Sequence, residues 1–292
     1  MGGYGRQLFA KPITEIIRAR SSVRTYNNQP LPTLIKEQIG QYASALENQP
    51  GIKVRFQAID SDIALKESGA RLGTYGMIKG ASSFVAAAVA KDNSSNNIEK
   101  LGYLFEKLVL FATSIGLGTC WVAGTLNREG FARAIDLNDD ELLPVITPVG
   151  YANKSMRLQD RMVKLIAGSS KRKGWEELFY SVDFQNGLSP SEAGSYSVPL
   201  EMVRIAPSAS NHQPWRIVRD GDTFHFYLSR TKGYKNRYGF DIQKIDLGIA
   251  MCHFELTAVE MGLTGDWTVR RPDVQEIPDD TEYIASWVAT GI

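Results

Sequence analysis

The stretch APSASNHQPWRIV, residues 206–218, is the most specific run of residues in the chain. Pro207 stops the apolar helical segment that precedes it. Three small residues follow: Ser208, Ala209 and Ser210. Small side chains let a backbone approach a flat ring closely, and the Asn211 and Gln213 amides offer the paired donors and acceptors that a pyrimidine edge requires. The alternative is a helix end that turns into a strand, with Trp215 in the core.

A second motif, RARSSVRTY at residues 18–26, places three arginines and two serines within one and a half turns of an apolar, basic helix. Guanidinium groups bind phosphate oxygens through two donors, and serine hydroxyls add neutral donors. The motif therefore suits a phosphate next to an electron-rich ring. A solvated basic helix face is the alternative when the motif is taken alone.

Two further segments lie in the first half of the chain. GLGTCWVAG, residues 116–124, is a glycine-ended helix followed by a strand, which is a weak signal by itself. PVGYANKSMRLQDR, residues 148–161, comes at the end of an apolar run and contains several basic residues. Their positions in the chain, more than their composition, make them candidates for a site.

Taken together, these motifs resemble the FMN-dependent nitroreductase family. APSASNHQPW resembles the family's PSxxNxQPW signature, and RARSSVRTY resembles its RRSxRxF arm. GLGTCWVAG and PVGYANK resemble the segments that line the flavin ring and close the domain, and the match extends over essentially the whole chain. The resemblance implies an α+β, nitroreductase-like fold, and the way the motifs divide between the two halves of the chain resembles the TM nitroreductase type.

The resemblance also assigns roles to residues. Arg20 and Ser22 would hold the FMN phosphate with Ser21 alongside, and Arg24 would face N1 and O2 of the ring. A positive charge there stabilises the negative charge that a flavin gains with a hydride. The residues that would present backbone to the ring near N5 are Trp121, Val122, Ala123 and Gly124. The cofactor-binding residues of the other motif would be Pro207, Ser208, Ala209, Asn211 and Gln213.

Some positions leave alternatives open. A basic residue should reach the phosphate from the closing segment, either Arg157 or, as second choice, Arg161. Some family members are acidic where this chain has Ala123, which leaves the orientation of the substrate open, and Ala152 replaces a family proline. The loop TYGMIKG either approaches the pyrimidine through Tyr75, Gly76 and Lys79 or is a plain loop.

An internal repeat divides the chain into half-domains at residues 1–167 and 168–292. The halves share the phrases FATSIGLGTCW and LTAVEMGLTGDW, and ENQPG matches SNHQPW. In the family dimer, the arm of one subunit and the PSxxNxQPW loop of the other meet over each flavin. Here the first half keeps the arm and the second keeps the loop, so we expect a pseudo-dimer with one FMN site in a monomeric chain.

Hydrophobic periodicity predicts the elements of both halves. Helices are expected over residues 13–20, 34–46, 97–117, 198–205 and 245–261. Strands are expected over residues 53–59, 83–90, 215–218, 223–228, 267–270 and 283–290, and a further apolar run over residues 142–149 closes the first half. Residues 168–195 are rich in glycine, serine and charge and are expected to connect the halves.

Composition limits the class of protein. With 292 residues, 43% of them hydrophobic, and a net charge of +1, the chain should be globular and gives no reason to expect nucleic-acid or membrane partners. No apolar stretch approaches the roughly 18 residues of a membrane span, and we expect a cytoplasmic protein. Cys120 and Cys252 lack the paired spacing of a zinc site, and the three histidines lie far apart, so no metal is expected.

The resemblance implies that NADH or NADPH reduces the bound FMN at N5 and that a small-molecule electron acceptor, a nitroaromatic or a quinone, reoxidises it. No side chain need act as a catalytic nucleophile or base. One alternative is another flavin enzyme on the same fold: a dehalogenase, a dehydrogenase or a flavin-degrading enzyme. Another is a non-catalytic FMN-binding protein. Residues 230–244 could cover the site, bind a nucleotide phosphate or form a solvated connection.

Overall fold

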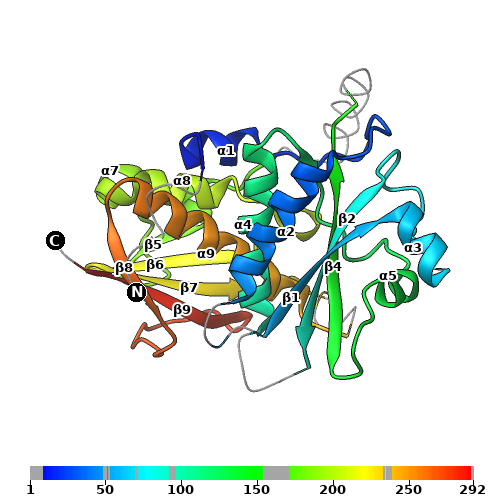
Figure 1. Cartoon of the computed structure of the whole chain (residues 1–292). Coiled ribbons are helices and arrows are strands. Elements are labelled where there is room, and N and C mark those ends of the chain that lie inside the picture. The colour runs from blue at the N-terminus through cyan, green and yellow to red at the C-terminus, as the bar shows by residue number, and fades with distance from the viewer. Residues whose placement is uncertain are drawn as a thin grey trace. The chain divides into compact units, whose positions relative to one another are not determined.

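The apolar run SFVAAAVA becomes an internal strand of an antiparallel sheet in the computed structural model of the chain (Figure 1). The structure describes residues 9–48, 51, 53–69, 72–91, 97–153, 171–232, 234 and 239–290. The chain forms two compact units: the first unit is Arg18–Ile166, and the second unit is Met1–Ile17 together with Ala167–Ile292. The N-terminal residues therefore group with the C-terminal half. A division of the chain at residues 167 and 168 would place them in the first half.

The first unit contains a four-stranded sheet with the order β1-β2-β4-β3, in which all neighbours are antiparallel. Its strands are β1 (Val54–Asp60), β2 (Ser83–Ala90), β3 (Gly118–Thr119) and β4 (Glu141–Gly150). Strand β2 is buried on both faces from Ser83 to Val89. Its small alanines allow helices to pack closely on either side.

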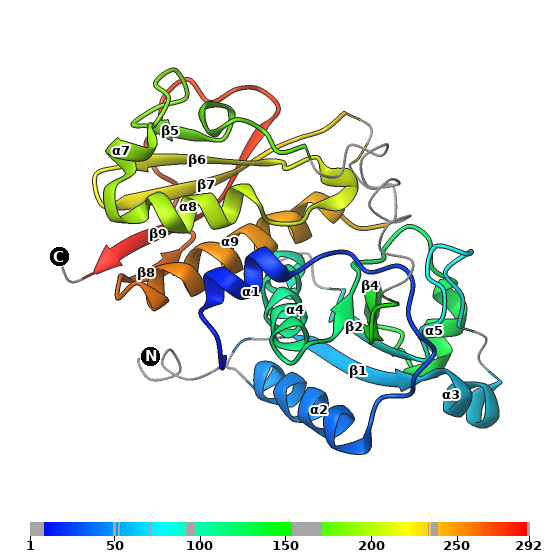
Figure 2. The same cartoon turned by 90° about the horizontal axis from the view of Figure 1, so that it is seen from above.

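Helices cover both faces of this sheet (Figures 1 and 2). They are α2 (Thr33–Glu47) and α4 (Asn97–Ser114) on one face, and α3 (Ser61–Ser68) and α5 (Arg128–Ala134) on the other. On the α4 side, the Phe105 ring stacks on Phe56 of β1 with centroids 5.6 Å apart. On the other side, Phe131 of α5 packs edge-on against Phe84 of β2 at 5.3 Å. Aromatic packing therefore fixes the sheet between two helical layers.

The second unit contains a five-stranded sheet with the order β5-β6-β7-β9-β8. Its strands are β5 (Phe179–Ser181), β6 (Trp215–Asp220), β7 (Thr223–Ser229), β8 (Thr264–Thr268) and β9 (Thr281–Thr290). Strand β5 is parallel to β6, and the other pairs are antiparallel. Without β5, the order repeats that of the first sheet, as an internal duplication requires.

The helices of the second unit come from both of its segments, the one before Arg18 and the one after Ile166. They are α1 (Ile13–Ala19), η2 (Trp175–Glu177), α7 (Pro190–Ala193), η3 (Gly194–Tyr196), α8 (Ser197–Arg204), η4 (Ala209–Asn211) and α9 (Ile242–Glu260). Helix α1 crosses the boundary at Ile17, and the Ile13 N–H donates to the Glu260 carboxylate at the end of α9. Helix α9 packs against α8 and the sheet, as α4 does in the first unit.

Every expected helix is present within a few residues of its predicted bounds, and so are the strands, with one shift. Strand β8 lies at Thr264–Thr268 and not at residues 267–270, because its register with β9 begins directly after the helix-ending glycine, Gly262. Helices α3 and α5 were not expected. Nor was β5, since residues 168–195 were expected only to connect the halves.

Candidate functional site

An extended segment, residues 20–27, follows α1 and crosses other segments of the first unit; we call it the arm. The Val23 N–H donates to the Thr119 carbonyl oxygen of β3 at 2.8 Å. Lys79 is bonded twice: its N–H donates to the Arg24 oxygen at 2.9 Å, and its oxygen accepts from the Tyr26 N–H at 2.8 Å. The arm thus joins β3 to the TYGMIKG loop through backbone hydrogen bonds.

The arm is not helical, contrary to the helical spacing that we expected for its arginines and serines. Helix α1 ends at Ala19, and the backbone groups that follow bond to segments remote in sequence, so the helical ladder does not continue. The Asn153 N–H, for example, donates to the Thr25 oxygen at 3.0 Å. The β-branched Val23 and Thr25 favour this extended backbone. The arm is therefore held by three segments that lie far apart in the sequence.

Three glycines make room for the arm. A Cβ on Gly118 would lie 2.8 Å from Val23 Cγ2, and one on Gly150 would lie 3.1 Å from Tyr26 Cδ1. Gly80 has a φ of +73°, and a Cβ there would lie 2.5 Å from the Tyr26 oxygen. Side chains at these positions would push the arm away from the sheet, so the glycines fix its path.

The arm carries polar side chains that lack protein partners. The side chains of Arg20, Ser22 and Arg24 make no hydrogen bond or ion pair with any residue that the structure describes, and Ser21 is exposed. Nε of Arg20 is buried yet has no acceptor within the described ranges. An unsatisfied buried donor destabilises the fold unless a ligand satisfies it. Two guanidinium groups and two hydroxyls on one extended segment fit a phosphate group.

Trp121 follows β3, and its side chain is fixed from the sheet's helical layer. The indole N–H donates to Glu106 Oε2 of α4 at 2.8 Å. The ring packs edge-on against Phe105, with centroids 4.9 Å apart and an interplanar angle of 88°. Because the polar atom of the ring is occupied, only the backbone of Trp121 is available for hydrogen bonds to a ligand.

The residues after Trp121 present backbone groups. Val122 exchanges two hydrogen bonds of 3.0 Å with Ile146, and the Ala123 oxygen accepts from Arg128 at 2.8 Å. The N–H groups of Ala123 and Gly124 have no acceptor among the residues with described positions. Gly124 is exposed. Two free donors therefore follow a rigidly anchored segment, an arrangement that suits an acceptor atom on a ring edge.

Four other predicted positions have different outcomes. Arg157 and the second choice, Arg161, lie outside the described residues. Tyr75 is 79% exposed and has a φ of +48°, a conformation uncommon for residues other than glycine. Lys79 holds the arm through its backbone. The TYGMIKG loop is therefore part of the same cluster as the arm, whatever its side chains contact.

The second motif lies in the second unit, in the turn from α8 to β6. The partly exposed residues at its start are Pro207, Ser208 and Ala209. After them the backbone enters the left-handed region, with φ values of +48° at Ser210, +58° at Asn211 and +48° at Gln213. Ser208 holds this turn, since its Oγ accepts from the Gln213 N–H at 2.9 Å and its carbonyl accepts from the Asn211 N–H at 3.0 Å.

The amides predicted to face a pyrimidine are occupied within the second unit. Asn211 Oδ1 accepts from Arg172 at 2.7 Å, and its Nδ2 donates to the Lys171 oxygen at 2.7 Å. Gln213 Oε1 accepts from the Lys173 N–H at 2.9 Å, and its Nε2 donates to the Asn211 oxygen at 3.0 Å. Contact with a pyrimidine stays a prediction for both residues, and it would require some of these hydrogen bonds to be exchanged.

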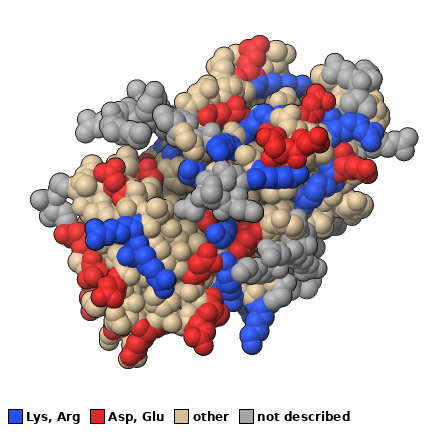
Figure 3. Space-filling model, turned by 90° about the horizontal axis from the view of Figure 1, so that it is seen from below, with Lys and Arg blue, Asp and Glu red and all other residues tan. Residues whose placement is uncertain are grey.

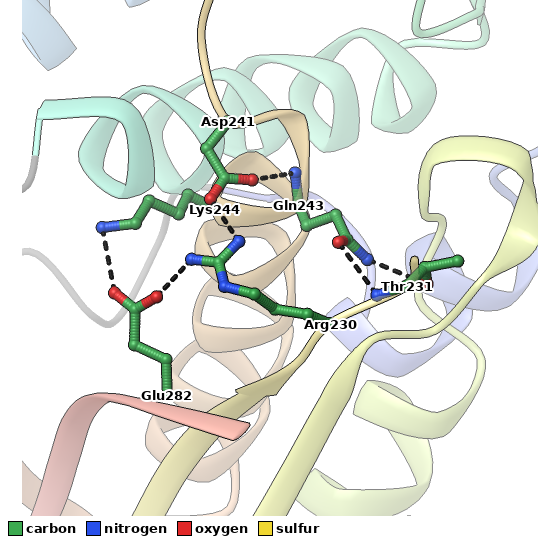
Figure 4. Close-up of polar contacts among 6 residues, drawn as sticks. All are labelled: Arg230, Thr231, Asp241, Gln243, Lys244 and Glu282. Atoms are coloured by element: carbon green, nitrogen blue, oxygen red, sulfur yellow. Dashed lines mark hydrogen bonds and ion pairs between the residues drawn. The ribbon is translucent and has the colours of Figure 1, made fainter. Parts of the chain in front are cut away.

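A polar cluster fixes both ends of residues 230–241 (Figure 4). Arg230 donates to Asp241 at 2.6 Å and to Glu282, and Gln243 bonds Thr231 through its amide oxygen at 3.2 Å and its amide nitrogen at 3.1 Å. Asp241 also caps α9 by accepting from the Gln243 N–H. The cluster therefore sets where this segment leaves the sheet and enters the helix.

Tyr234, between the ends of that segment, contacts the second motif. Its hydroxyl lies 2.5 Å from Ser210 Oγ, and its ring packs edge-on against His212 with centroids 4.8 Å apart. A purely solvated connection would make no such contacts. Whether the segment covers a site or binds a phosphate stays a prediction, because residues 233 and 235–238 lie outside the described ranges.

Sequence reasoning missed two buried carboxyl groups that contact candidate site residues. Glu106 of α4 is fully buried, and Asp246 of α9 is 2% exposed. Both interrupt helices that are apolar around most of their circumference, where a charged residue has no solvated face to occupy. That interruption was a usable signal. The partners, Trp121 for Glu106 and Ala209 for Asp246, follow only from the fold.

Lys and Arg side chains are interspersed with Asp and Glu on the face drawn in Figure 3. Within the described ranges, no three His, Cys, Asp or Glu residues are grouped to hold a metal ion. Among the helices of those ranges, none has the length and apolar character to cross a membrane.

The fold and the arm define the class of the protein, a nitroreductase-like fold doubled within one chain. The "putative nitroreductase" of Thermotoga maritima MSB8 is similar over 99% of this chain and 98% of its own, with 22% identity and a TM-score of 0.55. The chain belongs to the family described as "Putative TM nitroreductase", whose family model matches residues 12–258.

Other solved structures are similar to half of the chain. An FMN-dependent nitroreductase from Clostridium difficile R20291 matches 48% of this chain and 87% of its own, with 18% identity and a TM-score of 0.39. A nitroreductase with bound FMN from Bacteroides fragilis matches 50% and 90%, with 18% identity and a TM-score of 0.37. No curated protein has a sequence that matches this one.

Proposed function

We propose that the chain is an FMN-dependent oxidoreductase that takes electrons from NADH or NADPH and reduces a small-molecule acceptor of the nitroaromatic or quinone type. Membership of the nitroreductase family supports the reaction class. The observation that supports FMN as the cofactor comes from the arm. There, Arg20 Nε is buried without an acceptor in the described part of the chain. An FMN phosphate would supply that acceptor.

The residues of the first unit fit FMN in kind. Arg20 and Ser22, with Ser21, would hold the phosphate, and Arg24 would place a fixed positive charge beside the pyrimidine end of the ring. The backbone from Trp121 to Gly124 would donate to the ring. When bound, FMN supplies the hydride and electron chemistry, which leaves binding, orientation and electrostatics to the protein.

We propose that the second motif contacts the flavin through its backbone. Pro207, Ser208 and Ala209 are the residues that we assign to the flavin, whereas the amides of Asn211 and Gln213 would first have to leave their present hydrogen bonds. We further propose one FMN per chain, a monomer in solution and a cytoplasmic location. Sedimentation of the flavin-loaded chain tests the monomer directly.

The deciding experiment is the visible spectrum and flavin-to-protein ratio of the purified chain, followed by anaerobic addition of NADH and then NADPH. A ratio near one with bleaching of the flavin band supports the proposal and identifies the donor. Bound flavin that stays oxidised indicates a non-catalytic binding protein, and no flavin after addition of FMN contradicts the proposal. A panel of acceptors then separates nitro or quinone reduction from dehalogenation, dehydrogenation or flavin degradation.

Matched arginine variants test the assignment of the arm. Arg20→Met should weaken FMN binding about tenfold or more, since a charge-assisted hydrogen bond contributes about 1.5–3 kcal/mol. Arg18→Met is the control, because Arg18 is an exposed arginine only two positions away. Equal affinities for the two variants would remove Arg20 from the phosphate site.

A further inference from the structure

Asp246 is a buried acidic side chain of the second unit to which the proposed function gives no role. It lies on α9 among apolar neighbours and is 2% exposed. Its Oδ1 accepts from the Ala209 N–H at 2.9 Å, whereas its buried Oδ2 has no hydrogen-bond partner among the residues that the structure describes. A carboxyl group in this setting destabilises the helix packing, because one hydrogen bond offsets only part of the free energy lost when the group leaves water.

The recipient of that hydrogen bond is the turn with unusual backbone geometry. Ser210, Asn211 and Gln213 all have positive φ values, and each such residue is disfavoured by roughly 1 kcal/mol or more in the absence of support. The two hydrogen bonds that Ser208 accepts close the turn on itself, and the turn's side chains bond residues 171–173 and Tyr234, which lie outside any helix or strand. The bond from Ala209 to Asp246 attaches it to α9.

We propose that Asp246 is a positioning residue, which holds the Ala209 N–H and so fixes the backbone of residues 207–211 for the flavin. This inference rests on the proposed function, since that backbone is the part of the second motif assigned to the ring. Burial raises the pKa of Asp246 well above its ordinary value; the hydrogen bond from Ala209 opposes the rise, and nearby Asp241 adds to it. A neutral acceptor of the same shape should therefore serve as well as a carboxylate.

Two variants of Asp246 separate the hydrogen bond from the charge. Asp246→Asn keeps an oxygen at the Oδ1 position, so we expect FMN affinity within about twofold of wild type. Asp246→Leu removes the acceptor, and we expect FMN binding about tenfold weaker and faster hydrogen exchange of the amides at residues 210–213 in the FMN-free protein. Thr257→Val, which also replaces a buried polar side chain on α9, is the control and should leave both readouts unchanged.

A variant on the other side of the bond covers the case in which Asp246→Leu does not fold. Ala209→Pro removes the donor, and its backbone is suitable, because Ala209 begins η4 and Ser208 before it has φ −147° and ψ 161°. It should weaken FMN binding about as much as Asp246→Leu. If Asp246 acts through this N–H, combining the two substitutions should weaken binding no further.

The outcomes distinguish this inference from the proposed function. If wild type does not bind FMN, the proposed function fails, and the exchange rates at residues 210–213 alone decide whether Asp246 anchors the turn. If wild type binds FMN but Asp246→Leu and Ala209→Pro change neither affinity nor exchange, the inference fails and the proposed function stands. Independent, additive losses in the double variant would also overturn it.

Discussion

Gly118 of β3 allows the arm to lie against the sheet, and adding one methyl group there should disturb cofactor binding. In Gly118→Ala, the new Cβ would lie 2.8 Å, 3.0 Å and 3.1 Å from Cγ2, Cβ and Cγ1 of Val23. Valine is β-branched and stiff, and the contact includes its own Cβ, so rotation of the side chain cannot relieve it. The backbone of the arm must move.

Overpacking of this kind destabilises by about 1–3 kcal/mol, which corresponds to roughly 5- to 150-fold in binding if the arm must dock for FMN to bind. The assay is a titration of FMN with the protein, in which the quenching of flavin fluorescence measures binding. Gly40→Ala is the matched control: it lies on α2 with no atom within 4 Å of its added Cβ, and alanine stabilises a helix relative to glycine.

A second substitution tests the cause. Val23→Ala removes the two methyl groups that meet the new Cβ but keeps its own Cβ 3.0 Å away, so it should restore part of the affinity that Gly118→Ala loses. If Gly118→Ala binds FMN as tightly as wild type, or if Val23→Ala does not restore a lost affinity, the docked arm is not what organises the cofactor site.

Two further predictions concern the second unit. Arg230→Met leaves Asp241 and Glu282 without their shared cation, and we expect the free energy of unfolding to fall by about 1–3 kcal/mol in chemical denaturation, less than for a fully buried pair because the Glu282 side chain is 41% exposed. Lys244→Met is the smaller-effect control, and equal losses would contradict this ranking. Asp246, whose pKa is raised by burial, contributes stability that is complete below the pKa of the unfolded chain and is lost as the pH rises through its folded value. The melting temperature of Asp246→Asn should therefore decline less with rising pH than that of wild type, and parallel curves would refute this.

Elements with their own apolar periodicity could be predicted from the sequence. The long helices α4 and α9 repeat apolar residues over four or more turns, so local pattern alone indicated them. Strand β5 could not be found in this way. It has three residues and pairs in parallel with β6, with Phe179 opposite Ile217, and that partner is remote in sequence.

The candidate site could likewise be predicted only as far as local sequence determines it. The residue types of the arm pointed to a phosphate, but its extended backbone depends on Thr119, Lys79 and Asn153, which a helical count cannot include. The amides of Asn211 and Gln213 had the chemistry of a pyrimidine edge, yet residues 171–173 supply the same donors and acceptors from within the unit. Sequence indicated which groups are present; the partners of each group required the fold.

The grouping of α1 with the C-terminal half has a consequence for synthesis on the ribosome. The first unit, Arg18–Ile166, is contiguous and can fold as soon as it emerges. Helix α1, made before it, must wait for α9, which at about 5–20 residues per second takes tens of seconds. During that interval Ile13, Ile16 and Ile17, all buried in the finished protein, lack the α9 end of their unit. A nascent or truncated chain that stops after the first unit should therefore expose these apolar residues and need a chaperone. A chain that begins at Arg18 lacks them and should not.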